Sequence, residues 1–171
     1  MKSLILEGFM GCGKSSIAEQ LSKELNCPLY DTDALIEKDE NRSINEIFES
    51  SGEEYFRDLE TKMLEKLMQQ DGFCVISLGG GMPVREENRK LLRKLGTVVY
   101  IKAPAELLFK RLENEREKRP MLEGHELRQR IDELLRLREE AYLKAADFTM
   151  GLREEMTVKD AALCIRKACG I

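Results

Sequence analysis

The chain has 171 residues, of which 42% are hydrophobic and 35% are charged, and its formal net charge is −4. This length predicts one domain spanning residues 1–171, with enough apolar side chains for a buried core. The acidic balance argues against nucleic-acid binding driven by bulk charge, and no apolar run reaches the roughly 20 residues that cross a bilayer. With no signal-peptide pattern before the first strand, we expect a cytoplasmic protein with no nucleic-acid or membrane partner.

The five cysteines include no C-x-x-C pair, and His125 is the only histidine. A structural zinc site is therefore not expected, and the thiols are predicted to be reduced. His125 lies in a polar stretch, which favours a solvent-facing loop over a catalytic base.

The first motif is GFMGCGKS, residues 8–15, which matches G-x-x-x-x-G-K-[ST]. Residues 2–7 are predicted to form a strand and residues 14–26 an amphipathic helix, the context that a phosphate-binding loop requires. In such a loop, backbone N–H groups surround phosphate oxygens, the lysine reaches the β- and γ-phosphates and the serine hydroxyl coordinates magnesium. We predict that ATP is bound by Gly11, Cys12, Gly13, Lys14, Ser15 and Ser16.

A short strand is predicted at residues 28–30, and it is followed by Asp31 and Asp33. We expect these two side chains to point to opposite sides of an extended segment, so that one can face the metal and phosphates while the other faces an acceptor. The alternative is an ordinary Asx turn in which Asp33 caps the next helix. The nearby phosphate loop favours the functional interpretation.

Residues 43–70 have helical periodicity, with Ser43 and Glu46 spaced as a capping box and Gly52 predicted to divide two helices. Arg57 lies in the acidic stretch GEEYFRDLE. It either forms an ordinary ion pair with a neighbouring glutamate or clamps an acceptor carboxylate, and the spacing alone does not decide between the two.

Residues 73–78 read as a doubly buried parallel strand that ends in Gly79, Gly80 and Gly81 rather than in an acid. Three consecutive glycines favour a binding loop, where backbone must approach a ligand closely. A helix is predicted at residues 85–95, a strand at 97–101 and a further helix that begins near Pro104.

The segment 113–126 is highly charged and contains Arg116 and Arg119. It is either a solvated connection or a mobile lid that brings an arginine to the γ-phosphate. A long helix to about residue 146, a weak strand at 147–150 and a helix to residue 169 complete the chain. This alternation predicts an α/β fold with a parallel sheet covered on both faces and a ligand site at the carboxyl ends of the strands.

Together these motifs resemble the shikimate kinase family of the nucleoside-monophosphate-kinase-like P-loop group. The resemblance covers nearly the whole chain and rests on GFMGCGKS, DTD at 31–33, residues 43–60, GGG at 79–81 and RP at 119–120. It implies a three-layer P-loop kinase fold with a five-stranded parallel sheet of order 2-3-1-4-5. It also implies transfer of the γ-phosphoryl group of ATP, bound with Mg²⁺, to the 3-hydroxyl of shikimate.

The resemblance also implies roles for single residues. Lys14, Asp33 and Arg119 would be catalytic, with Asp33 as the base and Arg119 also contacting ATP, while Ser15 and Asp31 would support the metal. Arg138 would contact shikimate, and the neighbouring Arg136 is a competitor for that contact. For the adenine, the possible contacts are Arg111, Arg116 and Arg153. The implied substrate-binding segment is about 33–60. The implied shikimate contacts, in this segment and after it, are Asp33, Arg57, Gly79, Gly80, Gly81 and Arg138.

Two other functions are compatible with the phosphate loop. One is a different small-molecule kinase, such as a gluconate or nucleotide kinase, and the other is a nucleotide-dependent switch or binding module. The set of Asp33, Arg57 and three glycines suits a polyhydroxy carboxylate better than a nucleotide acceptor. We expect a monomer that binds ATP and shikimate.

Overall fold

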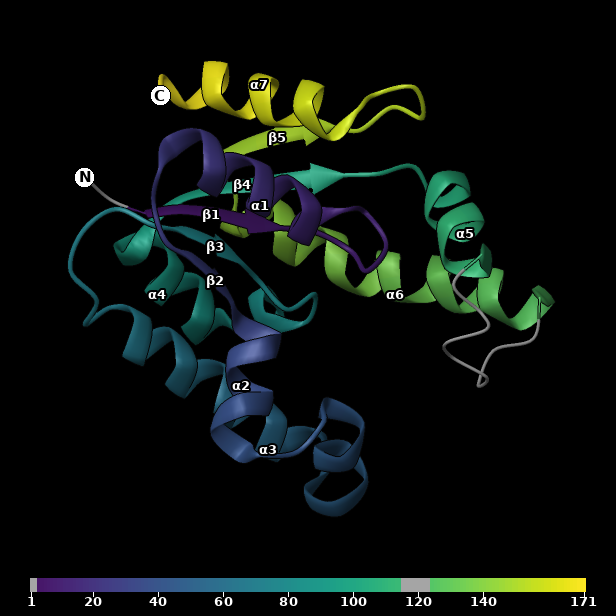
Figure 1. Ribbon diagram of the computed structural model, residues 1–171. Helices are drawn as coiled ribbons and strands as arrows, with labels where there is room; N and C mark the ends of the chain where they lie inside the picture. Colours follow the sequence, from purple (N-terminus) through teal and green to yellow (C-terminus); the bar gives the residue numbers. More distant parts are fainter. Residues whose placement is uncertain (1–2, 115–123) are drawn as a thin grey trace.

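The computed structural model describes residues 3–114 and 124–171, and a five-stranded sheet forms its centre (Figure 1). All neighbouring strands pair in parallel, in the order β2-β3-β1-β4-β5. The predicted fold class and strand order are therefore confirmed. The strands are β1 (Ser3–Glu7), β2 (Leu29–Asp31), β3 (Val75–Ser77), β4 (Gly96–Lys102) and β5 (Phe148–Gly151).

Helices cover both faces of this sheet, which gives three layers (Figure 1). Helices α1 and α7 pack together on one face, and α4 and α6 contact β4 on the other. Within the described parts of the chain, no helix has both the length and the apolar content needed to cross a membrane. The helices are α1 (Lys14–Leu25), α2 (Thr32–Glu40), α3 (Ile44–Leu67), the 3₁₀ helix η1 (Met82–Val84), α4 (Glu86–Leu95), α5 (Ala105–Asn114), α6 (Gly124–Ala145) and α7 (Val158–Cys169).

The central strand β1 is buried along its whole length because apolar layers lie on both of its sides. Leu4 and Leu6 belong to the core under α1 and α7, whereas Ile5 belongs to the core formed with α3 and α4. This alternation is the period of two that a strand imposes on its side chains. It explains why an almost uniformly apolar run is required at this point of the sequence.

The boundaries of four strands differ from the predicted ones. Strand β4 is one residue longer at each end than predicted, and β5 begins and ends one residue later. Strand β2 begins and ends one residue later than predicted, and β3 is limited to Val75–Ser77 instead of residues 73–78. Pairing with β1 nevertheless extends past β3, because Leu4 N donates to Cys74 O and Leu78 N donates to Leu6 O. Of the predicted run 73–78, only Val75–Ser77 therefore pair with strands on both sides, β1 and β2.

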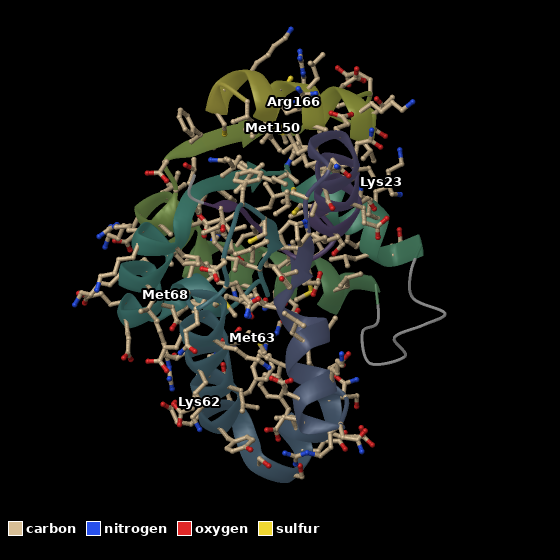
Figure 2. The ribbon with its side chains drawn as sticks, turned by 60° about the vertical axis from the view of Figure 1, so that its left-hand side comes forward. Lys23, Lys62, Met63, Met68, Met150 and Arg166 are labelled. Atoms are coloured by element: carbon tan, nitrogen blue, oxygen red, sulfur yellow. The ribbon has the colours of Figure 1, made fainter. Side chains whose placement is uncertain are left out.

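Helices α2 and α3 project from the sheet as an arm (Figures 1 and 2). The capping box of Ser43 and Glu46 begins α3, as predicted. Gly52, with φ 82° and ψ 172°, interrupts the helical geometry, so the predicted division into two helices is also confirmed. Met63, labelled in Figure 2, belongs to the apolar core of this half of the molecule. The second half of α3 thereby shares an apolar core with Ile5 and Ile76 of the sheet.

One residue of β1 breaks its apolar pattern. Glu7 is completely buried, and among the described residues neither of its carboxylate oxygens has a hydrogen-bond partner. Burial raises the pKa of Glu7 to about 9, although the positive charge of Lys14 acts in the opposite direction. A carboxyl group in such surroundings is held neutral at pH 7.

This burial predicts a pH-dependent cost to stability. The pKa of Glu7 rises from 4.5 to about 9 on folding, so its proton is retained in the folded state and lost from the unfolded state between these values. Stability therefore falls as pH rises through this window and is unaffected by Glu7 below it. We expect Glu7→Gln to increase the free energy of unfolding by roughly 2–4 kcal/mol at pH 8 and by much less at pH 5.

Urea denaturation at both pH values measures this difference. The control is Glu65→Gln, which changes an exposed glutamate of α3. A gain from Glu7→Gln of the same size at both pH values would contradict the explanation.

Candidate functional site

The loop of residues 8–13 joins β1 to α1 and has the geometry of an anion-binding loop. Gly11 and Gly13 have φ of 78° and 90°, which favours glycine at both positions. Lys14 folds over the loop, where Nζ donates to Gly8 O at 2.8 Å and to Phe9 O at 3.1 Å. The first turn of α1 contains no acidic residue. The loop, the lysine and the helix N-terminus therefore form an arrangement that favours an anion, and phosphate binding by these residues stays a prediction.

Two side-chain oxygens that could bind a metal lie close together beside this loop. Ser15 Oγ donates to Asp31 Oδ2 at 3.3 Å, across the gap between α1 and the end of β2. Magnesium is bound in kinases by few protein oxygens, with phosphates and waters completing its coordination. The pair of Ser15 and Asp31 therefore fits the predicted Mg²⁺ site.

The geometry expected for Asp31 and Asp33 is wrong, although the two residues lie where predicted. Asp31 is the N-cap of α2, and its Oδ1 accepts from Asp33 N at 3.1 Å and from Ala34 N at 3.2 Å. Alternate residues of an extended segment point to the same side, so the expected divergence does not follow even from a strand. The chain is moreover already helical at Thr32. The alternative in which Asp33 caps the helix is wrong as well, since Asp31 is the cap.

Each of the three glycines after β3 lies against one of the predicted acceptor residues. A Cβ atom on Gly79 would overlap Oδ1 of Asp33, and a Cβ on Gly81 would overlap the guanidinium of Arg57. At Gly80 the same position lies 3.6 Å from Nη1 of Arg138. The loop therefore brings together three residues from α2, α3 and α6, and the lack of side chains on the loop makes their approach possible.

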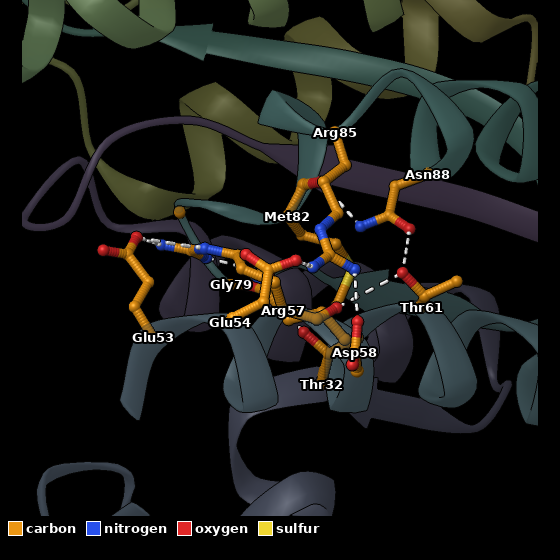
Figure 3. Close-up of polar contacts among 12 residues, drawn as sticks. Thr32, Glu53, Glu54, Arg57, Asp58, Thr61, Gly79, Met82, Arg85 and Asn88 are labelled. Carbon is orange, nitrogen blue, oxygen red and sulfur yellow. Dashed lines mark hydrogen bonds and ion pairs between the residues drawn. The ribbon is translucent and has the colours of Figure 1, made fainter. Parts of the chain in front are cut away.

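Hydrogen bonds from three surrounding elements hold this loop in place, and Figure 3 shows two of them. Gly79 N donates to Thr32 Oγ1 at 2.8 Å, and Asn88 Nδ2 donates to Met82 O at 2.9 Å. The third bond runs from the Tyr142 hydroxyl to Gly80 O. Because Thr32, Asn88 and Tyr142 are all completely buried, the loop backbone has a well-defined position.

Arg57 forms the ion pairs that its acidic neighbourhood suggested and also faces the glycine loop. Its guanidinium donates to Glu53 Oε1 at 3.0 Å, as Figure 3 shows. It also donates to Glu60 Oε2 at 2.8 Å. Glu60 is 1% exposed, and its Oε1 has no partner among the described residues. Burial raises the pKa of Glu60 to about 7, against the lowering effect of Arg57. The two interpretations of Arg57 are thus compatible, because Glu60 holds the guanidinium that points at Gly81.

Asp33 has the properties of a group that exchanges protons near neutral pH. Burial raises its pKa to about 6, Asp31 adds to this increase, and Lys14 opposes it. Its Oδ1 is buried and has no hydrogen-bond partner among the described residues. A carboxylate that is mostly ionised at pH 7 and unpaired beside an open loop is suited to accept a proton from a bound hydroxyl.

The structure separates the two arginine candidates on α6. Arg138 points inward, with its guanidinium carbon 6.0 Å from the ring centre of Phe9 and its Nη1 beside Gly80. Arg136 is exposed and lies beside Arg128 and Asp132 on the outer side of the helix. Arg138 is therefore the arginine that reaches the candidate site.

A cleft of about 170 Å³ lies next to the phosphate loop, between α1 and the start of α7. Arg111 borders it and donates from Nη1 to Gly11 O and Cys12 O, at 3.2 Å each. Arg153 is exposed and does not line the cleft. Of the two candidate arginines for the adenine that the structure describes, Arg111 is thus the one that borders the cleft. The cleft is lined by Cys12, Gly13, Ser16, Ile17, Arg111, Leu152, Met156, Thr157, Val158 and Ala161.

Arg116 and Arg119 lie outside the described residues, as does most of the predicted lid of residues 113–126. Their roles stay predictions.

Comparison with known proteins agrees with this arrangement. The family model for shikimate kinase matches residues 10–168. The chain belongs to the shikimate kinase family. It is 48% identical to a shikimate kinase of Dictyoglomus turgidum over 70% of this chain and 71% of the relative. It is 37% identical to a shikimate kinase of Clostridium botulinum strain 657 over the whole of both chains.

Among solved structures, the shikimate kinase of Acinetobacter baumannii in complex with shikimate superposes with a TM-score of 0.85 at 30% identity. The match covers 99% of this chain and 91% of that one. Family membership favours shikimate kinase over the gluconate kinase alternative.

Sequence reasoning missed several residues that shape this site. Thr32 lies between the two aspartates that drew attention, and its hydroxyl holds the glycine loop. Tyr142 lies four residues after Arg138, one helical turn along the same face. That spacing was the only local signal for it. Glu60 was considered only as an ordinary partner of Arg57, because its complete burial depends on tertiary packing.

The contacts of the glycine loop predict a graded response to alanine substitution. A methyl group at Gly79 or Gly81 displaces Asp33 or Arg57, whereas at Gly80 it meets atoms at 3.5–3.7 Å, an ordinary contact distance. We expect Gly79→Ala and Gly81→Ala each to reduce kcat/KM for the acceptor at least about tenfold, and Gly80→Ala to reduce it only a few-fold. Steady-state kinetics of the three variants measures this. Equal losses in all three would contradict the assigned contacts.

Proposed function

We propose that this chain transfers the γ-phosphoryl group of ATP to the 3-hydroxyl of shikimate, giving shikimate 3-phosphate and ADP. Membership of the shikimate kinase family supports this function. The observation that carries it is the convergence of Asp33, Arg57 and Arg138 on three successive glycines beside the phosphate loop. These residues offer one base and two guanidinium groups, which matches an acceptor that has both hydroxyls and a carboxylate.

The donor half binds and neutralises the phosphates. Lys14, now held by the carbonyls of Gly8 and Phe9, exchanges these bonds for oxygens of the β- and γ-phosphates. Ser15 and Asp31 would hold Mg²⁺, which neutralises phosphate charge when bound. The cleft bordered by Arg111 accommodates the adenine.

The acceptor half positions the hydroxyl for attack. Arg57 and Arg138 bind the carboxylate of shikimate, and its ring packs on the glycine loop. The 3-hydroxyl oxygen bonds to the γ-phosphorus as the bond to the β-phosphate oxygen breaks, and Asp33 receives the hydroxyl proton. Most of the rate enhancement comes from position and charge neutralisation rather than from a covalent intermediate.

Arg119 completes the proposal as a residue of the lid. From the segment 113–126 it would reach the γ-phosphate and neutralise charge that develops during transfer. We also propose that the chain acts as a single-domain, cytoplasmic monomer.

An acceptor screen tests the proposed function. ADP formation is measured with ATP and Mg²⁺ against shikimate, gluconate and nucleoside monophosphates. We expect turnover with shikimate alone, and no turnover with shikimate would refute the function.

The role of Asp33 as a base predicts a large loss in the rate of transfer. Asp33→Asn cannot accept the proton, so we expect kcat to fall about 10²–10⁴-fold while the dissociation constant of ATP is unchanged. Because the pKa of Asp33 is raised to about 6, the wild-type kcat/KM for shikimate falls as pH decreases through about 6 and Asp33 becomes protonated. The control is Asp39→Asn, on the exposed side of the same helix. Near-normal kcat in Asp33→Asn would exclude this base.

The role of Arg57 predicts a defect confined to the acceptor. Arg57→Lys keeps a positive charge beside Glu60 but loses the planar pair of donors that fits a carboxylate. We expect kcat/KM for shikimate to fall about tenfold and KM for ATP to stay within twofold. Arg85→Lys is the matched control, since Arg85 also forms ion pairs with two acidic residues of α3, Asp58 and Glu54 (Figure 3). An equal defect in both variants would contradict a direct contact.

A further inference from the structure

Tyr142, near the end of α6, contacts the glycine loop, which lies about 62 positions earlier in the chain. It is completely buried, and its hydroxyl donates to Gly80 O at 2.5 Å. Its ring packs on Tyr100 of β4, with ring centres 5.0 Å apart. A phenylalanine would satisfy the apolar packing equally well, and what the tyrosine adds is the hydrogen bond of its hydroxyl to Gly80.

Gly80 lies where the two halves of the site meet. The position of a Cβ on this residue is 3.5 Å from Gly8 O, at the start of the phosphate loop. It is also 3.6 Å from Nη1 of Arg138 and 3.7 Å from the Tyr142 hydroxyl. The donor loop, the acceptor loop and α6 are therefore in contact around one residue.

The other hydrogen bonds to this loop hold its flanks. Thr32 binds Gly79 N before Gly80, and Asn88 binds Met82 O after it. Among the described residues, the side-chain hydrogen bond to the middle of the loop comes from Tyr142. Because Arg138 lies one turn earlier on α6, a single helix both holds the loop and carries a guanidinium to it.

We propose that Tyr142 is a positioning residue that sets the distance between the phosphate donor and the acceptor. Its hydroxyl holds the Gly80 carbonyl and so keeps the acceptor loop in register with Gly8 on one side and Arg138 on the other. The inference rests on the proposed function, because the acceptor is the molecule that this loop supports. A small displacement of the acceptor reduces the rate of transfer without weakening the binding of ATP.

The test compares two variants that each remove one hydroxyl from the same ring pair. Tyr142→Phe removes the donor to Gly80, and Tyr100→Phe removes a hydroxyl that makes no bond to this loop. We expect Tyr142→Phe to lower kcat/KM for shikimate about tenfold, mainly through kcat, and Tyr100→Phe to change it less than twofold. KM for ATP and the slow ATP hydrolysis without acceptor are expected to match wild type in both variants, with similar thermal midpoints.

The other outcomes overturn the proposal in distinguishable ways. Wild-type kinetics in Tyr142→Phe excludes the positioning role but leaves the proposed function intact. Equal losses in both variants, loss of ATP affinity, or failure of Tyr142→Phe alone to fold means that the hydroxyl serves the fold instead. A wild-type enzyme without activity on shikimate refutes the proposed function, and the positioning role with it.

Discussion

The parallel pairing of β3 with both β1 and β2 is the constraint on which the site depends. Parallel strands end at the same edge of a sheet, so the segments that follow them are neighbours. Here these segments are the phosphate loop after β1, the capping Asp31 of β2 and the three glycines after β3. The proposed phosphate, metal and acceptor sites therefore lie together although their residues are far apart in the sequence.

Absence of side chains on the glycine loop lets charged groups gather in a partly buried space. Asp33 and Glu60 have raised pKa values there, and two arginines balance them. Such a cluster is costly to the folded state, and so is the neutral buried Glu7 beneath the phosphate loop. The packing of β1 between two apolar layers offsets these costs. The middle of the sheet thus contributes stability, whereas the charged groups of the candidate site lie at its carboxyl edge.

Much of the fold could be predicted because local patterns agree with the tertiary structure. The phosphate loop, the capping box at Ser43 and the break at Gly52 all depend on residues close in sequence. The orientation of Asp31 and Asp33 could not be predicted, since it depends on where α2 begins. Contacts of Thr32 and Tyr142 with the glycine loop join residues 47 and 62 positions apart, and no short pattern specifies them. The roles of Arg119 and the lid stay predictions.

A crystal structure of the protein with shikimate and a non-hydrolysable ATP analogue would show whether the acceptor binds between the two arginines and the glycine loop. We expect the shikimate ring to lie on residues 79–81, with its carboxylate between Arg57 and Arg138. Its 3-hydroxyl is expected within hydrogen-bonding distance of Asp33 and in line with the γ-phosphate. Binding of the carboxylate away from both arginines, or a hydroxyl other than the third facing the phosphate, would contradict this expectation.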